Sequence, residues 1–307
     1  MRIAVFGVGG VGGYFGWRLA RSGEDVVFIA RGENLQALRN NGLTVETLDG
    51  ESFTLPVRAT DDSRAVGPVD AVLMGVKAWQ VPEAAPALRP LMGPETFVVP
   101  FQNGVEAPSQ LAAVLGTEHV FGGLCYIVSY LVEPGRIRHA GLEPYVAFGE
   151  LDNQLTRRAQ MLQEAFTRAG VRVEIPPDIH APMWEKFLFI ATLSGLAAVA
   201  RAPVGIIRSI PETRAILKEL IDEVVAVARA RRIDLKEDAA AVTMAVVDRL
   251  PAESTTSMQR DIMEGRPSEL ESQCGAVVRL GREVGQDAPL NSFIYGSLLP
   301  QEMRARQ

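Results

Sequence analysis

Residues 2–21 read RIAVFGVGGVGGYFGWRLAR, in which a short apolar run gives way to closely spaced glycines and then to a helical pattern. Gly7, Gly9 and Gly12 fit the spacing Gly-x-Gly-x-x-Gly, and Gly10 lies within the same segment. Gly7 permits a tight turn, Gly9 lets the backbone approach a ligand, and Gly12 lets helix and strand pack closely. The pattern therefore predicts a dinucleotide site, with the pyrophosphate on the N–H groups and positive dipole end of the helix.

The first 178 residues continue this alternation of short apolar runs and helical patterns. Strands are expected at residues 3–6, 26–30, 69–76 and 96–100, and helices at 11–21, 34–40, 81–91 and 106–115. Such alternation indicates βαβ units and a parallel sheet. Later strands are expected at 121–130, 136–139, 145–149 and 171–175, with a helix at 153–169. These strands would extend the sheet in an antiparallel or mixed manner.

The Pro176-Pro177-Asp178 sequence breaks this pattern, because consecutive prolines continue neither a helix nor a central strand. Beyond it, long apolar-periodic patterns predict helices at residues 182–200, 211–232, 236–250 and 268–284. The expected fold is therefore α/β, with a Rossmann-type dinucleotide-binding domain at 1–178 and an all-helical domain at 179–307. Apolar helices of the second domain could form its core or a homodimer interface.

Composition indicates which classes of binding partner and which cellular compartment are expected. The chain has 307 residues and a net charge of −6, which gives no support for binding nucleic acid or an anionic membrane surface. The longest uncharged apolar stretch, residues 187–200, is shorter than the roughly 20 residues of a membrane span, which indicates a buried helix. The apolar run at the N-terminus is too short for a signal peptide. Two isolated cysteines favour a cytoplasmic protein, and with three scattered histidines they show no metal-ligand spacing.

The end of the second expected strand bears on the choice of cofactor. NAD-binding proteins usually place an acidic residue there for the ribose 2′-hydroxyl. This chain instead has Arg31, in the sequence FIARG at residues 28–32. An arginine can pair with a 2′-phosphate through its planar fork of donors, which favours NADP, although a solvated arginine at a strand end is the alternative.

Several short segments, in order and at consistent spacing, together resemble one family. They are the glycine segment, Arg31, VKAWQ at 76–80, QNG at 102–104, WEK at 184–186, and SMQRD at 257–261 with Glu269 beyond it. Over essentially its full length the chain resembles the ketopantoate reductases (2-dehydropantoate 2-reductases). The resemblance implies NADPH-dependent reduction of a small-molecule 2-keto acid, such as 2-dehydropantoate to pantoate in pantothenate and coenzyme A biosynthesis.

The resemblance also implies roles for single residues. Lys77 would contact the cofactor, and Asn103 would contact the nicotinamide ribose or the substrate, although Asn-Gly is also a common turn. Lys186 would stabilise the developing alkoxide and donate the proton that a ketone needs as it accepts hydride. Ser257 would bind the substrate carboxylate. Glu269 would accept a hydrogen bond from a substrate hydroxyl and help to hold Lys186.

Some of these positions have purely structural alternatives. A lysine at a helix start is ordinarily solvated, Ser257 could cap a helix, and Glu269 would suit the dipole of a first helical turn. A protein that senses NADPH without turnover is a further alternative, because the fold alone does not decide function. The combination of lysine, serine and glutamate favours an enzyme.

Two positions depart from the family pattern. Well-studied ketopantoate reductases have asparagines four and eight residues after the lysine, where this chain has Ile190 and Ser194. A spacing of four keeps residues on one helical face, so both would line the substrate site if Lys186 does. An isoleucine cannot bind a substrate hydroxyl, which leaves a more apolar 2-keto acid as an alternative substrate.

Overall fold

The computed structural model describes residues 1–307, apart from the side chain of Leu142, as two compact units. The first unit comprises Met1–Gln102 and Ala107–Ile179, and the helical unit comprises Asn103–Glu106 and His180–Gln307. The division falls one residue after the predicted boundary. The prediction differs at Asn103–Glu106, which it assigned to the first domain. These residues belong to the helical unit because Asn103 and Glu106 bond to side chains of that unit.

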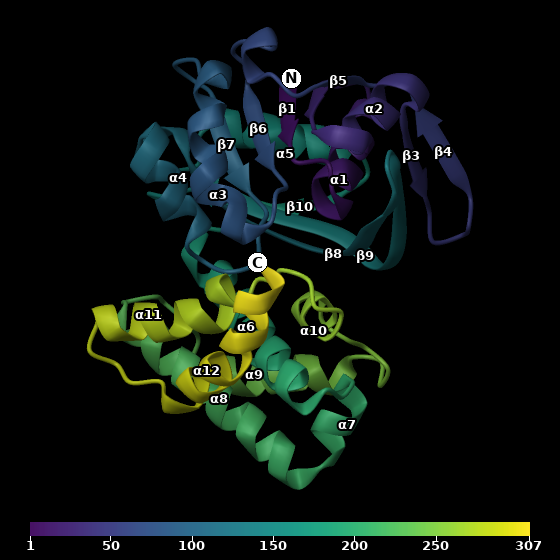
Figure 1. Cartoon of the computed structure of the whole chain (residues 1–307). Helices are drawn as coiled ribbons and strands as arrows, with labels where there is room; N and C mark the ends of the chain where they lie inside the picture. Colours follow the sequence, from purple (N-terminus) through teal and green to yellow (C-terminus); the bar gives the residue numbers. More distant parts are fainter. The chain divides into compact units, whose positions relative to one another are not determined.

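A parallel sheet forms the middle of the first unit (Figure 1). Its strands, in spatial order, are β5 (Arg58–Thr60), β2 (Asp25–Ile29), β1 (Arg2–Phe6), β6 (Ala71–Met74) and β7 (Phe97–Pro100). All neighbours pair in parallel, as predicted for βαβ units. Along β1, Ile3 and Val5 enter one apolar cluster while Ala4 and Phe6 enter another, so both faces of the sheet are buried.

Helices and short 3-10 turns connect and cover these strands. The helices are α1 (Gly10–Arg21), α2 (Gly32–Asn41), α3 (Val81–Ala84) and α4 (Ala107–Leu115). A fifth helix of this unit, α5 (Arg157–Arg168), packs against α1. The predicted helix at residues 81–91 is α-helical only in its first turn. The 3-10 turn Ala85–Leu91 replaces the rest, since Pro86 and Pro90 cannot donate helical hydrogen bonds.

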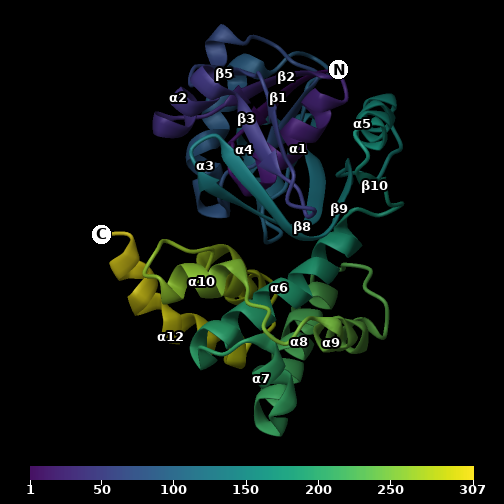
Figure 2. The same ribbon diagram turned by 90° about the vertical axis from the view of Figure 1, so that its right-hand side faces the viewer.

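The later strands form a second sheet instead of the predicted extension of the first. Its strands are β3 (Leu43–Glu46), β4 (Ser52–Leu55), β8 (Phe121–Glu133), β9 (Arg136–Glu150) and β10 (Arg172–Glu174). Figure 2 shows β8 beside β9. The separate strands expected at 136–139 and 145–149 are one strand. Pairing with β8 carries β9 across Gly141 and Pro144, where the alternating pattern breaks. Strands β3, β4 and β5 were not predicted.

The helical unit is built around one apolar helix, α6 (His180–Ala200). The other helices are α7 (Val204–Ser209), α8 (Pro211–Ala230), α9 (Ala239–Arg249), α10 (Ser257–Met263), α11 (Ala276–Glu283) and α12 (Pro289–Ala305). All of these except α11 pack directly on α6, and Figure 2 shows several of them grouped about it. By length and composition α6 could span a membrane, yet 72% of its most apolar window is buried, which makes it a core helix.

The segment at 268–284, predicted as one regular helix, begins differently. Residues Glu271–Gly275 form a π-helical turn before α11 starts. The amide of Gly275 bonds to the carbonyl of Leu270, five residues earlier. Such turns are rare in proteins as a whole, and those that occur often lie at functional sites. Helices α7 and α12 were not predicted.

Candidate active site

The glycine segment of the first unit has the shape that a dinucleotide needs. Gly7 has a φ of 97°, which favours glycine, and a Cβ on Gly12 would lie 2.2 Å from the carbonyl oxygen of Gly7. A Cβ on Gly9 would meet nothing within 4 Å, so the backbone there is open to a ligand. Helix α1 begins at Gly10 without a side-chain cap. Its first N–H groups and its dipole therefore suit a pyrophosphate.

Arg31 and Lys77 lie at the same edge of the parallel sheet as the glycine turn. Register pairs Phe6, the last residue of β1, with Ile29 of β2 and with Met74 of β6. Gly7, Arg31 and Lys77 come one, two and three residues after these three strand ends. Both cationic side chains are exposed. This is the carboxyl edge, at the point where the chain switches from one side of β1 to the other, which is where open α/β sheets bind ligands.

Two contacts of the glycine segment were not foreseen in the sequence. Asn34 of α2 donates to the carbonyl of Val8 at 2.8 Å and accepts from the amide of Gly135 at 2.8 Å, so it ties the segment to the β8–β9 turn. A Cβ on Gly10 would lie 2.4 Å from the carbonyl oxygen of Ser129 in β8. Gly10 is therefore required by a close approach of β8, a long-range contact that local spacing does not reveal.

In the helical unit, the helix that begins at Ser257 and the π-helical turn just after Glu269 both pack on the helix that carries Lys186. Lys186 lies near the start of α6, Ser257 is the first residue of α10, and Glu269 lies just before the π-helical turn. Both α10 and the π-helical turn pack against α6. Lys186 is 9% exposed, which contradicts the alternative of a solvated lysine at a helix start.

Glu269 is the centre of a group of amide side chains. Its Oε2 accepts from Nδ2 of Asn103 at 3.0 Å and from Nε2 of Gln273 at 3.4 Å. Glu269 is 5% exposed and Gln273 is fully buried, so these contacts are largely shielded from water. Oε1 of Gln273 has no hydrogen-bond partner among the residues that the structure describes. Gln273 was not singled out in the sequence, although its spacing of four from Glu269 is that of one helical face.

The segment Asn103–Glu106 is fixed to the helical unit at three points. Asn103 bonds to Glu269, and a Cβ on Gly104, whose φ is 98°, would lie 2.6 Å from the carbonyl oxygen of Ser272. Glu106 accepts two hydrogen bonds from the guanidinium of Arg279, at 3.1 and 2.8 Å. Hydrogen bonding with Glu106 raises the pKa of Arg279 above its ordinary value. Asn103 is thus held against Glu269 within the helical unit.

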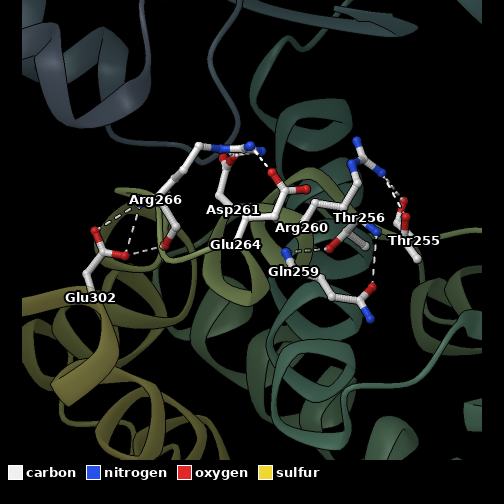
Figure 3. Close-up of polar contacts among 9 residues, drawn as sticks. Thr255, Thr256, Gln259, Arg260, Asp261, Glu264, Arg266 and Glu302 are labelled. Carbon is white, nitrogen blue, oxygen red and sulfur yellow. Dashed lines mark hydrogen bonds and ion pairs between the residues drawn. The ribbon is translucent and has the colours of Figure 1, made fainter. Parts of the chain in front are cut away.

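Ser257 does not cap its helix. Thr256 is the N-cap of α10, and its hydroxyl and the Gln259 side chain form a reciprocal capping box, drawn in Figure 3. The capping role considered for Ser257 is therefore wrong, and its half-buried hydroxyl is available at the first turn of α10. Arg266 donates twice to Oδ1 of Asp261, at 3.1 and 2.9 Å, and so fixes the chain between α10 and Glu269 (Figure 3).

Ile190 and Ser194 lie beyond Lys186 along α6 but differ in exposure. Ile190 is half-buried and packs against the apolar core of the helical unit. Ser194 is fully buried, and its Oγ has no hydrogen-bond partner among the described residues. The face of α6 beyond Lys186 is therefore mostly apolar.

Each unit thus carries a different set of chemical groups. The first unit offers a glycine turn and two cations at a sheet edge, which suits a phosphorylated dinucleotide. The helical unit offers a buried ammonium, a carboxylate with two amides, and a serine hydroxyl. A buried ammonium can stabilise an oxyanion and donate a proton to it.

Comparisons with known proteins match the two parts of the chain to two family models. Residues 3–153 match the family described as Ketopantoate reductase PanE/ApbA, and residues 178–302 match its C-terminal family. The 2-dehydropantoate 2-reductase of Nostoc sp. is 30% identical over 303 residues, covering 97% of this chain and 94% of that protein. The uncharacterized oxidoreductase YkpB of Bacillus subtilis is 29% identical, covering 97% of this chain and 98% of that protein.

A solved structure of a 2-dehydropantoate 2-reductase is similar to this chain in fold. The crystal structure of 2-dehydropantoate 2-reductase from Geobacter metallireducens superimposes with a TM-score of 0.90 at 31% identity. The similarity covers 98% of this chain and 99% of that chain. The two chains therefore share their fold.

Proposed function

Because the chain belongs to the ketopantoate reductase family, we propose that it reduces a 2-keto acid with NADPH, and that 2-dehydropantoate is the first candidate substrate. Family membership makes the protein an oxidoreductase that uses a nicotinamide dinucleotide, which sets aside a purely sensing role. The observation that carries the proposal is the buried group around Glu269, just before the π-helical turn that packs against the helix of Lys186.

The residues of the helical unit have complementary tasks in this reaction. The bound cofactor supplies the hydride. Lys186 holds a proton near the keto oxygen and donates it as the alkoxide develops. Ser257 donates a hydrogen bond to the substrate carboxylate. Glu269, whose Oε2 is oriented by Asn103 and Gln273, accepts a hydrogen bond from a substrate hydroxyl.

NADPH is the proposed cofactor because of the cationic residue at the end of the second strand. Arg31 is exposed at the carboxyl edge of the sheet, next to the strand that ends in the glycine turn. A guanidinium there can form two charged hydrogen bonds with a 2′-phosphate. Lys77, on the other side of β1, adds a second positive charge for the cofactor phosphates.

A more apolar 2-keto acid is the second candidate substrate, and Ile190 is the observation that favours it. Its side chain packs with the apolar core one turn beyond Lys186 and offers no hydrogen bond to a hydroxyl. Glu269 favours the opposite choice, because a buried carboxylate acceptor is well matched to a hydroxyl. A site built to bind a hydroxyl rejects the analogue that lacks it far more strongly than an apolar site does.

A matched pair of substrates separates these candidates. Trimethylpyruvate differs from 2-dehydropantoate only by the missing hydroxyl. We expect NADPH oxidation, monitored by absorbance, to have a higher kcat/KM with 2-dehydropantoate. The reverse order would make the apolar acid the substrate. Absence of turnover with both acids and with a wider panel of 2-keto acids would contradict the proposed reaction.

We also propose that the reaction takes place in the cytoplasm. Both cysteines, Cys125 and Cys274, are free and buried in the structure, as suits a reducing compartment. Fractionation of cells that express the protein, with detection by an antibody, would test this assignment.

A further inference from the structure

The last turn of α12 places a buried carboxylate against the segment that carries Glu269. Glu302 is 4% exposed, and its two oxygens accept from the amide of Ser268, each at 3.1 Å. Oε2 of Glu302 also accepts from the hydroxyl of Ser268. Figure 3 labels Glu302 and marks contacts of its carboxylate with dashed lines. A carboxylate held in this way acts as a cap for the turn that begins at Ser268.

Ser268 is fixed through every polar atom that it has. Arg306 donates from Nη2 to the carbonyl of Ser268 at 3.0 Å and from Nε to Oε1 of Glu302 at 2.6 Å. The hydroxyl of Ser268 accepts from the amide of Leu270 at 3.2 Å. The residues on both sides of Glu269 are therefore anchored, one directly by Glu302 and the other through Ser268.

The anchoring continues into the site itself. Glu269 lies between Ser268 and Leu270, so its backbone position is set by the contacts of these two neighbours. Its side chain then receives Asn103 and Gln273. A shift of Ser268 would displace the carboxylate of Glu269 from both amides, and a misplacement of about 1 Å near a reacting group can lower the rate about a hundredfold.

We propose that Glu302 is a positioning residue, which holds Glu269 in its working orientation by capping the Ser268 turn from the C-terminal helix. The inference rests on the proposed function, since it assumes that Glu269 contacts the substrate. It assigns a task to α12, an element that carries none of the residues predicted to bind cofactor or substrate.

The helical unit contains a matched control for this role. Glu223 accepts from the amides of Leu290 and Asn291 at 2.8 and 2.9 Å, and so caps the other end of the same helix. It also accepts from Nδ2 of Asn291 at 2.7 Å. Glu223→Gln removes the charge from a capping carboxylate as Glu302→Gln does, but at a turn that does not adjoin Glu269.

The test compares these variants at a temperature where thermal melts show both to be folded. We expect Glu302→Gln to lower kcat for the 2-keto acid about tenfold to a hundredfold, with the KM for NADPH little changed. Glu223→Gln should keep the parent kcat. Hydrogen exchange should quicken at the amides of Ser268 and Leu270 in Glu302→Gln and stay slow in Glu223→Gln. If Glu302→Gln does not fold, Ser268→Ala can replace it, because this substitution removes only the contacts of the hydroxyl. We then expect a smaller loss of kcat, with faster hydrogen exchange at the amides of residue 268 and Leu270.

The outcomes separate this inference from the proposed function. An unaltered kcat in Glu302→Gln, or an equal loss in Glu223→Gln, would overturn the positioning role. So would unaltered exchange at Ser268 and Leu270. If the unmodified protein reduces no 2-keto acid, the proposed function fails, and the exchange data still decide whether Glu302 holds the Glu269 segment.

Discussion

At the scale of single residues, Lys186 is a basic side chain that is only 9% exposed to water. It lies on α6, on which Trp184 and Phe187 are also buried. Burying an ammonium is costly even when it has polar partners, and an apolar replacement of similar volume is often neutral or stabilising. A position that lowers stability in this way is typical of functional sites. We therefore expect the buried Lys186 to serve the proposed reaction and not packing alone.

Lys186→Met is the substitution that separates these two explanations, because methionine keeps the length and apolar stem of the side chain. We expect kcat to fall by about 10²–10⁴, since a proton donor is lost. The melting temperature should stay the same or rise. The KM for NADPH should change little. A folded variant with near-normal turnover would transfer the role of general acid to another group, with Lys77 as the next candidate.

We expect Arg31 to determine the preference for NADPH over NADH. We expect Arg31→Ala to lose most of the preference for NADPH over NADH, because charged hydrogen bonds to a phosphate contribute about 1.5–3 kcal/mol, or roughly tenfold to a hundredfold in affinity. Arg39→Ala is a suitable control, since Arg39 is exposed like Arg31 but lies on α2 and donates to the carbonyl of Ala59. Equal affinity of the unmodified protein for both cofactors, measured by fluorescence titration, would contradict the assignment.

At the scale of elements, local patterns were enough to predict the glycine segment, the parallel strands β1, β2, β6 and β7, and α6. Each depends on residues close together in sequence, such as the apolar run that ends at Gly7. The segment Asn103–Glu106 was assigned to the wrong unit because its partners, Glu269 and Arg279, are more than 160 residues away. The π-helical turn was missed because the apolar periodicity of residues 268–284 differs little from that of a regular helix.

The second sheet was misplaced for a similar reason. Its pairing of β3 with β9 joins residues about 90 positions apart, and alternation of apolar residues does not state which strand is the partner. The roles of Gly10, Asn34 and Glu302 also depend on long-range contacts, with Ser129, Gly135 and Ser268 respectively. Candidate site residues could thus be selected by motif, whereas the residues that hold them in place required the structure.

A substitution at Gly104 would measure how much the close approach of this residue to the π-helical turn contributes to stability. Gly104→Ala should destabilise the protein by about 2–4 kcal/mol, because alanine is strained at a φ of 98° and its Cβ would lie 2.6 Å from a backbone oxygen of the π-helical turn. Gly265→Ala meets the same strain at a φ of 68° but has nothing within 4 Å, so about 1–2 kcal/mol is expected. Urea unfolding would measure both free energies. Equal losses would mean that the close approach to Ser272 adds nothing.

At the scale of the whole molecule, the two units have separate apolar cores, and each contains one buried cysteine. Cys125 belongs to a core cluster of the first unit, and Cys274 belongs to the core of the helical unit. Burial raises the pKa of the Cys274 thiol to about 12, so in the folded state it is protonated at pH 8 and unreactive. Each thiol therefore reacts with an alkylating reagent mainly when its own unit opens.

Cofactor binding should protect these two thiols unequally, because the glycine segment and Arg31 both lie in the first unit. A ligand at a hundred times its Kd stabilises the state that binds it by about 2.7 kcal/mol, which lowers the open population about a hundredfold. In moderate urea at pH 8, with alkylation measured by mass spectrometry, NADPH should slow the labelling of Cys125 far more than that of Cys274. In Arg31→Ala the same protection should require a higher concentration of NADPH. Equal protection of both thiols would show instead that the units open as one cooperative block, because stabilisation of one core would then be felt fully by the other.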